Sequence, residues 1–258
     1  MPEGDTIAYA ANRIRPVLEG REPDEIRTPQ SRHARDRWPQ RLADRAVTEV
    51  ATHGKNLFLR FEGGLVLHSH LRMTGSWMVY RSSDRWRRSP KRAWIVFTRG
   101  DQQVVEFDGP VLELLTESRL RFDQRFTALG PDVLASEFDA GRFVSRLRSD
   151  DPTRAIGDAL LDQRTVAGIG NVWKAEGCWE ARVDPWRRIR DVDDAEAVAI
   201  VEAMRPRMKR SAERGPLTIR PRVYGHAGRP CPRCATLIRA YGQGDDNRTT
   251  YWCPGCQS

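Results

Sequence analysis

Residues 231–256 read CPRCATLIRAYGQGDDNRTTYWCPGC and contain two CxxC pairs with 18 residues between them. Each pair offers two thiolates from one tight turn, and this spacing is typical of a four-cysteine zinc site. Two disulfides are the alternative, which the cytoplasmic location expected below disfavours. We therefore predict a small ribbon in which one Zn²⁺ stabilises the fold and does no chemistry. The predicted zinc ligands are Cys231, Cys234, Cys253 and Cys256.

The hydrophobic period changes along the chain before this ribbon. DTIAYAANRIRPVLEG (residues 5–20) predicts an amphipathic helix that Asp5 caps, with Pro16 bending or shortening its last turn. From residue 47 to residue 107 the period is two, and NLFLRF and LVLHSH flank a Glu-Gly-Gly turn. We expect an antiparallel β region there, packed against the first helix or a second sheet.

A helical pattern with Gly, Pro and Asp breakers fills residues 136–213, in segments such as FVSRLR, AIGDALLDQ, NVWKAEGCW and AEAVAIVEAMRPRMKR. Cys178 lies within it, and we interpret this cysteine as a buried apolar residue and not as a metal ligand. The predicted fold class is therefore α+β and multidomain. The predicted domains are residues 1–132, 133–224 and 225–258.

The charge balance favours a polyanionic partner. The 258 residues include 43 Lys and Arg against 35 Asp and Glu, a net charge of +8. Such an excess is common in nucleic-acid-binding proteins, although a merely basic surface would give the same balance. No apolar run approaches the roughly 18 residues of a membrane span. The N-terminal residues lack the basic-then-apolar order of a signal peptide, so we expect a cytoplasmic protein without membrane contact.

Pro2 and Glu3 form the first candidate reactive pair. Once Met1 is removed, Pro2 carries the only free secondary amine of the chain, and amines attack electrophilic sugar carbons to give Schiff bases. The plain alternative is that Pro2 is a small residue that permits removal of Met1. Glu3 beside it supplies a carboxyl group that can move protons.

Further candidates lie at predicted strand ends. Lys55 in HGKNLF stands at the entrance to a strand, where an ordinary surface lysine is the default interpretation. His70, Arg72 and Met73 in HLRMTG follow a strand. Met73 either packs in the core or projects as a wedge between bases. Residues 81–92 carry six basic residues and one acid, a pattern of a solvated loop that is also compatible with DNA binding.

TVAGIGN (residues 165–171) lies between two helical segments. Its glycines permit a tight turn, Asn171 is suited to cap the next helix, and N–H groups at a helix start can bind phosphate. A plain helical hairpin would look similar. Arg248 is expected in the turn of the ribbon, where an arginine can fork onto a phosphate, although alone it is more often solvated.

Taken together, PEGDT, HGKNLF, HLRMTGSW, GIGN, VYGHAGRPCPRC and YWCPGCQ occur here in this order. In order and spacing, the chain resembles the formamidopyrimidine-DNA glycosylase and endonuclease VIII family over its whole length. The resemblance implies an N-terminal β-sandwich with a leading helix, a helix–two-turns–helix domain and a zinc finger. It also implies that damaged DNA is the partner and base excision repair the process. We expect a monomer.

The resemblance assigns roles to individual residues. By position, Pro2 is the nucleophile that attacks the anomeric carbon, and Glu3 is the acidic partner that protonates the opened sugar. Lys55 matches a lysine that contacts phosphate and assists catalysis. Asn171 and Arg248 match residues that grip the phosphates around the flipped nucleotide.

Other positions bear on the substrate. His70 lies where the family commonly has a further phosphate-contacting histidine. FDGPVLEL lacks the arginine–phenylalanine pair of the formamidopyrimidine branch, Gly157 replaces a lysine of that branch, and residues 214–224 leave little room for its long lesion-covering loop. These departures favour the endonuclease VIII branch, which prefers oxidised pyrimidines. Met73 with Arg72 would then fill the gap left by the flipped base.

We expect a bifunctional DNA glycosylase and β,δ-lyase that acts on oxidised pyrimidines. One alternative, with the same fold, is an enzyme that prefers oxidised purines. Another is a non-catalytic, zinc-dependent DNA-binding protein. Pro2, Glu3 and Lys55 argue against the last alternative, because binding requires neither an amine terminus nor its adjacent acid.

Overall fold

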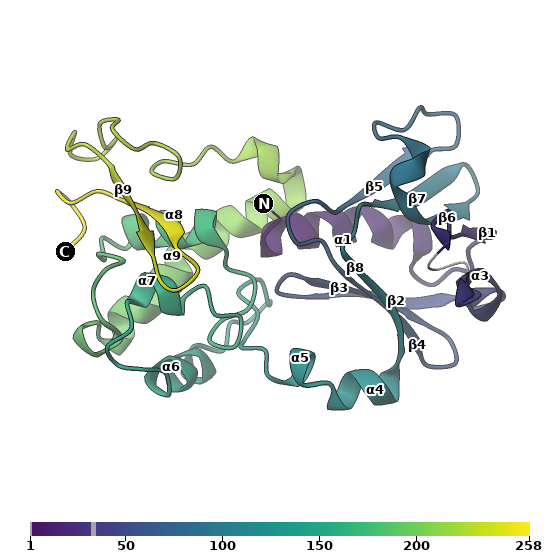
Figure 1. Cartoon of the computed structure of the whole chain (residues 1–258), viewed down its shortest axis with the longest axis horizontal. Helices are drawn as coiled ribbons and strands as arrows, with labels where there is room; N and C mark the ends of the chain where they lie inside the picture. Colours follow the sequence, from purple (N-terminus) through teal and green to yellow (C-terminus); the bar gives the residue numbers. More distant parts are fainter. Residues whose placement is uncertain (1, 32–34) are drawn as a thin grey trace. The chain divides into compact units, whose positions relative to one another are not determined.

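The computed structural model describes residues 2–31 and 35–258. The chain folds into two compact units (Figure 1). Unit 1 contains Pro2 and Thr6–Thr127, and unit 2 contains Glu3–Asp5 and Ala128–Ser258. The three domains predicted above stay predictions.

Unit 1 consists of two four-stranded antiparallel sheets with helix α1. The first sheet, in spatial order, is β2 (Val47–His53), β3 (Asn56–Phe61), β4 (Leu65–His70) and β8 (Val111–Thr116). The second is β1 (Glu25–Arg27), β6 (Ala93–Arg99), β7 (Gln102–Phe107) and β5 (Ser76–Arg81). The helices are α1 (Gly4–Leu18), α3 (Trp38–Leu42), η1 (Pro90–Arg92), α4 (Glu117–Phe122) and α5 (Gln124–Thr127).

The core of unit 1 explains why both sheets and α1 fold together. Ile7, Ile14 and Leu18 recur on one face of α1 and join a single buried cluster with residues from both sheets. The sheets therefore pack face to face with the helix at their side. This confirms the predicted N-terminal helix and antiparallel sandwich. The Glu-Gly-Gly turn also lies where it was expected, between β3 and β4.

The prediction that Asp5 caps α1 was wrong. The helix begins at Gly4, so Asp5 already lies in its first turn. The Asp5 carboxylate is buried and accepts a hydrogen bond from the Ser211 hydroxyl. An aspartate can either cap a helix or accept a buried hydrogen bond. Here it accepts one, because Ser211, 206 residues away in the sequence, lies beside it. Helix α1 does include Pro16 and ends at Leu18.

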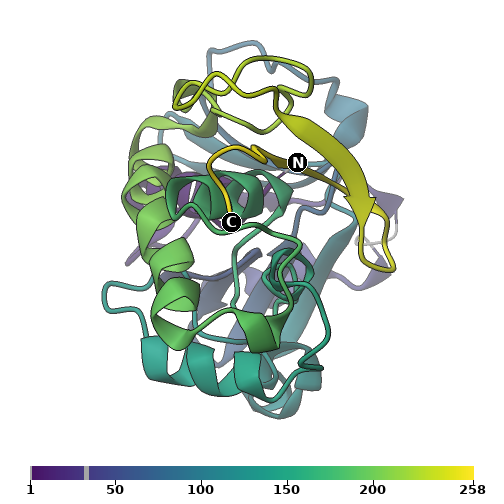
Figure 2. The same ribbon diagram turned by 90° about the vertical axis from the view of Figure 1, so that its left-hand side faces the viewer.

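Unit 2 is helical and carries the ribbon (Figure 2). Its helices are α6 (Ala140–Arg148), α7 (Ile156–Ala159), α8 (Asn171–Glu180), η2 (Ile189–Asp191), α9 (Asp194–Arg214) and η3 (Pro216–Thr218). The ribbon pairs β9 (Arg239–Gln243) with β10 (Arg248–Trp252) in antiparallel register. Helix α8 packs along α9 and is buried over nearly its whole length.

One helical segment is shorter than predicted. AIGDALLDQ forms a helix only over Ile156–Ala159. The backbone N–H groups of Ile156 and Gly157 donate to the carbonyls of Arg187 (2.8 Å) and Pro185 (3.0 Å), so the start of this segment is held by another part of unit 2. Within the described residues, no helix has the length and apolar character needed to cross a bilayer.

Candidate active site

Glu3 lies at the start of α8. Its carboxylate accepts hydrogen bonds from the backbone N–H groups of Gly170 (2.9 Å), Val172 (2.8 Å) and Trp173 (3.3 Å). The first N–H groups of a helix have no partner within the helix, and the helix dipole favours an anion there. Glu3 is only 2% exposed and is therefore fixed in one position. Pro2, which is half-buried, is attached directly to this fixed residue.

The prediction that Asn171 caps this helix was wrong. Gly170, and not Asn171, occupies the cap position, and no side chain of the cap residue accepts a hydrogen bond. The N–H groups expected to bind a phosphate bind the Glu3 carboxylate instead. A Cβ atom on Gly170 would lie 2.3 Å from Cδ of Glu3, so a glycine is required for this close approach.

Asn171 and Arg248 meet through the ribbon. The side-chain amide of Asn171 donates to the carbonyl of Thr249 (2.7 Å), the residue that follows Arg248. Arg248 begins β10 directly after the turn and pairs with Gln243. It was predicted in the turn itself, so its predicted position differs by one residue. Its side chain is 45% exposed and lies 3.6 Å from the carboxylate of Asp246. Unit 2 thus brings Glu3, Asn171 and Arg248 to one region.

The four predicted cysteine ligands also come together. Their sulfur atoms lie within 4.8 Å of one another, with Sγ–Sγ distances of 3.8 Å for Cys231–Cys256 and 3.3 Å for Cys234–Cys253. A tetrahedral zinc ion with Zn–S bonds of about 2.3 Å needs sulfur atoms about 3.8 Å apart. The donor set therefore fits a structural zinc ion.

Contacts around the cysteine cluster support thiolate ligands. The indole N–H of Trp179 (3.3 Å) and the backbone N–H of Arg233 (3.4 Å) both donate to the sulfur of Cys231. Such donors stabilise a negatively charged sulfur and orient it toward the metal. The remaining cysteine, Cys178, is fully buried, and burial raises the pKa of its thiol to about 12. This agrees with its prediction as an apolar core residue.

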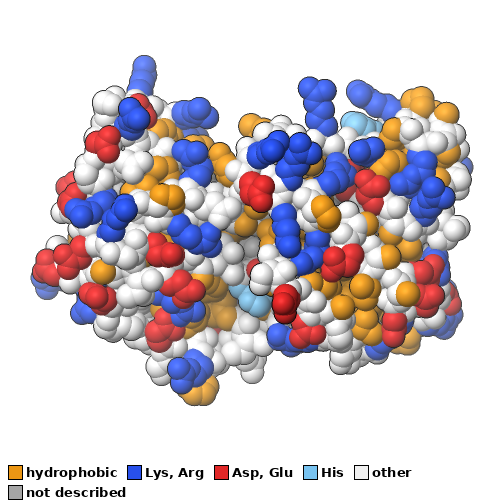
Figure 3. Space-filling model, turned by 180° about the vertical axis from the view of Figure 1, so that it is seen from behind, with side chains coloured by type: hydrophobic (Ala, Val, Ile, Leu, Met, Phe, Trp, Pro, Cys, Tyr) orange, Lys and Arg blue, Asp and Glu red, His pale blue; other side chains and the backbone are white. Residues whose placement is uncertain are grey.

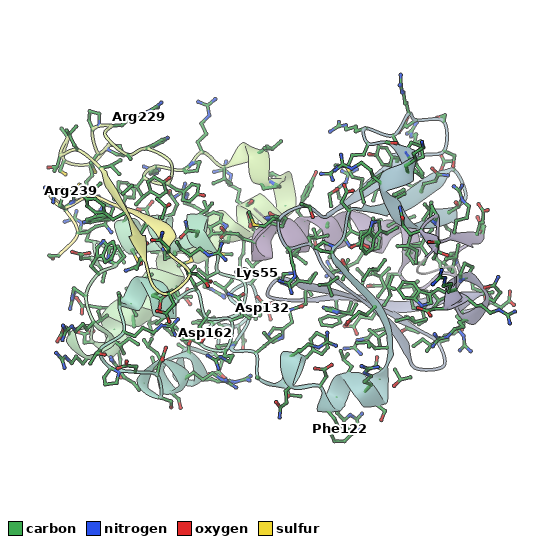
Figure 4. All side chains as sticks on the ribbon, viewed as in Figure 1. Lys55, Phe122, Asp132, Asp162, Arg229 and Arg239 are labelled. Carbon is green, nitrogen blue, oxygen red and sulfur yellow. The ribbon has the colours of Figure 1, made fainter. Side chains whose placement is uncertain are left out.

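Unit 1 carries the other predicted site residues on two turns. Lys55, labelled in Figure 4, lies with Gly54 in the two-residue turn between β2 and β3. His70 ends β4, and its Nδ1 atom accepts the backbone N–H of Arg72 (3.1 Å). Burial, then the charges of Arg72 and Lys55, lowers the pKa of His70. The mutual influence of these groups places Lys55, His70 and Arg72 in one neighbourhood.

Met73 is 64% exposed in the turn after β4. Core packing, one of its two interpretations, is therefore excluded for this structure, and a role as a wedge stays a prediction. The neighbouring turn is held in place, because Arg88 donates to the carbonyl of Thr74 (3.1 Å) and to the carboxylate of Asp108 (2.6 Å). Arg88 belongs to the arginine-rich segment 81–92, part of which is thus structural. Lys and Arg side chains are spread over the visible face in Figure 3, with acidic groups among them.

A buried histidine behind the Lys55 turn was missed by the sequence analysis. His68 Nε2 lies 3.0 Å from Oδ1 of Asn56, and the Asn56 amide donates to the carbonyl of His53 (3.2 Å). Because the amide nitrogen already donates, the proton of this contact belongs to Nε2 of His68. Burial lowers the pKa of His68 to about 4, although Glu113 lies 3.4 Å from Nδ1 and opposes this shift. His68 thus supports the turn that carries Lys55 through Asn56.

Lys174 was also missed. It lies three residues after Asn171 in α8 and is fully buried. Its place just after GIGN, in a chain with only four lysines, was a usable signal.

Comparison with known proteins identifies the family. Residues 1–123 match the family model described as the formamidopyrimidine-DNA glycosylase N-terminal domain, and residues 129–222 match that of the formamidopyrimidine-DNA glycosylase H2TH domain. "Probable endonuclease 8 2" of Streptomyces coelicolor is 41% identical over 273 residues, covering 100% of this chain and 94% of that protein. "DNA-(apurinic or apyrimidinic site) lyase Nei2" of Mycolicibacterium smegmatis is 35% identical over 269 residues, covering 100% and 99%.

The fold matches a solved structure as well. A complex between the Lactococcus lactis Fpg protein and DNA containing an abasic site superposes with a TM-score of 0.82 at 21% identity, covering 99% of each chain. At this identity the match concerns the fold. The two family models and the relatives named endonuclease 8 together show that the chain belongs to the formamidopyrimidine-DNA glycosylase and endonuclease VIII family, on its endonuclease VIII side.

Proposed function

We propose that this protein is a bifunctional DNA glycosylase and abasic-site lyase of base excision repair, which removes oxidised pyrimidines and cleaves the strand by β,δ-elimination. Damaged DNA is its partner, and we expect it to act as a monomer in the cytoplasm. Family membership and relatives named endonuclease 8 and DNA-(apurinic or apyrimidinic site) lyase support this proposal.

The observation that carries the proposal is the position of Glu3. Three N–H groups of α8 hold its carboxylate, so the residue that follows Pro2 cannot move freely. A DNA-binding protein without catalysis has no need to fix its second and third residues in this way. An enzyme that uses the terminal amine as its nucleophile does need it, because reaction rates depend on the orientation of the attacking group.

The chemistry follows from the properties of a secondary amine. An α-amino group titrates near about 7.7–8.0, against about 10.4 for a lysine, so a usable fraction of Pro2 is unprotonated at neutral pH. The Pro2 nitrogen attacks the anomeric carbon, and the C–N bond to the damaged base breaks with the base as the leaving group. The Glu3 carboxylate takes the proton that the nitrogen loses and returns it to the ring oxygen as the sugar opens.

Ring opening leaves an iminium ion between Pro2 and the former anomeric carbon. This cation withdraws electrons, so the neighbouring C–H proton becomes acidic and the 3′ phosphate leaves in β-elimination. A second elimination releases the 5′ phosphate. Lys55, Asn171 and Arg248 are proposed to bind the phosphates, since ammonium, amide and guanidinium groups are ordinary phosphate donors.

The remaining assignments concern the lesion and the metal. Met73, exposed and next to Arg72, is proposed to fill the gap left by the flipped nucleotide, with His70 contacting a phosphate beside it. We assign one zinc ion to the four cysteines, where it would stabilise the ribbon that carries Arg248. Preference for oxidised pyrimidines rests on the sequence departures at FDGPVLEL and Gly157.

The test is borohydride trapping on duplex DNA with an abasic site. Protein with a free Pro2 amine should form a covalent adduct that maps to the terminal peptide. Protein that retains Met1 has a tertiary amide at the Pro2 nitrogen, with no nucleophilic lone pair, and serves as the control. It should fold, bind zinc and bind DNA, yet give neither trapping nor cleavage. Comparable trapping yields at matched DNA occupancy would move the nucleophile elsewhere, with Lys55 as the first candidate.

A panel of duplexes with single lesions tests the substrate class. Faster excision of oxidised pyrimidines than of oxidised purines is expected. The reverse order would leave the Pro2 chemistry intact and overturn the lesion assignment.

A further inference from the structure

A fully buried lysine lies directly beneath the ribbon that carries Arg248. The Lys174 ammonium group donates to the hydroxyl of Thr250 (2.5 Å) and lies 3.5 Å from Oε1 of Gln243. The Thr250 hydroxyl donates to the same Oε1 (2.8 Å). The Gln243 amide nitrogen donates to the carbonyl of Pro185 (2.8 Å). Every polar group in this small network therefore has a partner.

The network has no countercharge in contact. Within the described part of the chain, no carboxylate lies within salt-bridge distance of Lys174. Burial lowers the pKa of Lys174 to about 8, against the weaker opposing influence of Cys178, Asp158 and Glu3. Burying an ammonium group without an ionic partner is costly. Such a cost is commonly tolerated where the charge is used.

Lys174 and its hydrogen-bond partners are close neighbours of the predicted phosphate-binding residues Asn171 and Arg248. Asn171 and Lys174 are three positions apart on α8 and so share one face of the helix. Asn171 donates to Thr249 and Lys174 donates to Thr250, two successive residues of β10. Arg248 directly precedes these two residues on that strand, and its partner across the ribbon is Gln243.

Position 157 on α7 leaves no room for a side chain. A Cβ atom at position 157 would lie 2.7 Å from Oε1 of Gln243 and 2.9 Å from Cβ of Pro185. A side chain there would therefore displace Gln243. The same Oε1 atom lies 3.5 Å from Nζ of Lys174. In this chain a cation reaches the base of the ribbon from α8, while position 157 is closed.

We propose that Lys174 is a positioning residue for phosphate binding, whose buried ammonium group fastens the Arg248 end of the ribbon to α8 and adds a positive charge behind the bound phosphate. This inference rests on the proposed function, because the phosphate is that of the DNA substrate. A phosphate bound by Asn171 and Arg248 stabilises the charged form of Lys174, so binding is strongest where the ammonium is protonated.

The charged and titratable groups that face Lys174 come from several elements of unit 2. Arg248 on β10 is the cation whose charge acts on Lys174, and Thr250 and Gln243 have no ionisable group. Asp158 on α7 and Glu3 are the carboxylates whose charges act on Lys174. Cys178 on the same helix stays neutral, since burial raises the pKa of its thiol to about 12. Affinity for DNA should therefore fall as the pH rises through about 8.

The experiment measures the affinity of zinc-loaded protein for a duplex with a reduced abasic site, which cannot form a Schiff base, between pH 7 and pH 9.5. Lys174→Met keeps the length of the side chain and removes its charge. It should bind about tenfold more weakly at pH 7. The component of the pH dependence centred near 8 should be missing from this variant. The Pro2 amine titrates in the same range in both proteins, so the difference between the two curves reports Lys174.

Two further variants make the result decisive. Lys209 is an exposed lysine on α9, and Lys209→Met should bind within about twofold of wild type with an unchanged pH curve. Lys174→Gln keeps a donor for Thr250 without the charge. Like Lys174→Met, it should bind weakly without the pH component, and it replaces Lys174→Met if that variant does not fold.

Three outcomes would overturn the inference. Wild-type affinity in Lys174→Met is one, and wild-type affinity in Lys174→Gln at all pH values is another, since the charge would then be unnecessary. Weaker binding with an unchanged pH curve is the third, because it indicates a structural contact alone. The trapping experiment on wild-type protein separates these results from a failure of the proposed function, which would appear as no adduct with the wild-type protein.

Discussion

Replacement of Glu3 by glutamine tests the structural half of the proposed mechanism. The carboxylate accepts three backbone N–H groups, two at one oxygen and one at the other. A glutamine side chain presents an oxygen at only one of these two positions. Its NH₂ group at the other position faces a donor, so at least one buried N–H group loses its acceptor.

The size of the effect follows from these contacts. An unmatched buried donor costs about 1–3 kcal/mol. The loss of an anion at the start of a helix costs about 0.3–1 kcal/mol more. Glu3→Gln should therefore lower the free energy of unfolding of unit 2 by about 1.3–4 kcal/mol. It should also lose most base excision, because it cannot carry the proton, and retain some cleavage at abasic sites, because it keeps the Pro2 amine.

Urea unfolding monitored on zinc-loaded protein measures the stability change, and excision and abasic-site cleavage are assayed on the same samples. Glu213→Gln is the matched control, since Glu213 is an exposed carboxylate on α9. It should change the free energy of unfolding by less than about 0.5 kcal/mol. A Glu3→Gln variant as stable as this control would refute the bonding of Glu3 to α8.

The remaining predictions concern the ribbon, the phosphate contact, the wedge and the buried histidine. Cys231→Ser should lower the thermal stability of unit 2 and abolish DNA binding, because the ribbon loses its metal. This prediction is contradicted if the purified wild-type protein contains no zinc and the variant still cuts DNA normally. Arg248→Ala should weaken binding to all lesions alike and reduce the salt slope of affinity by about one, whereas a loss confined to one lesion would mean that Arg248 reads the base. Met73→Ala should slow cleavage of duplex DNA much more than of single strands, since only a duplex needs its gap filled; equal slowing argues against a wedge. For His68, whose pKa is lowered from 6.5 to about 4, the unfolded chain binds the extra proton, so the free energy of unfolding should fall as the pH drops from 6.5 to about 4. His68→Gln should remove that slope in pH-dependent denaturation, and an unchanged slope would refute the assignment.

Local patterns predicted what depends on neighbouring residues. The CxxC pairs indicated the cysteine cluster because each pair brings its two sulfur atoms together by itself. The period of two indicated the strands because one face of each sheet is buried. Arg248 was placed within a residue of its position because β9 and β10 are short and the turn between them is fixed by their pairing.

Contacts between distant residues could not be predicted in this way. Asn171 was wrongly assigned as a cap because asparagine has the right propensity, whereas the acceptor is Glu3, 167 residues from Gly170. Lys174 escaped notice because a lysine is almost never fully buried. Its burial depends on Gln243 and Thr250, which no pattern around position 174 reveals.

The sequence distance between Glu3 and its donors has a consequence for biosynthesis. The N-terminus leaves the ribosome first, but its three hydrogen-bond donors, at positions 170, 172 and 173, are made much later. A nascent or prematurely terminated chain that ends before these residues has the Pro2 amine without the helix that fixes its neighbour. Long-range contacts of this kind form late in folding. Glu3, next to the proposed nucleophile Pro2, is therefore held in place only after α8 has been made.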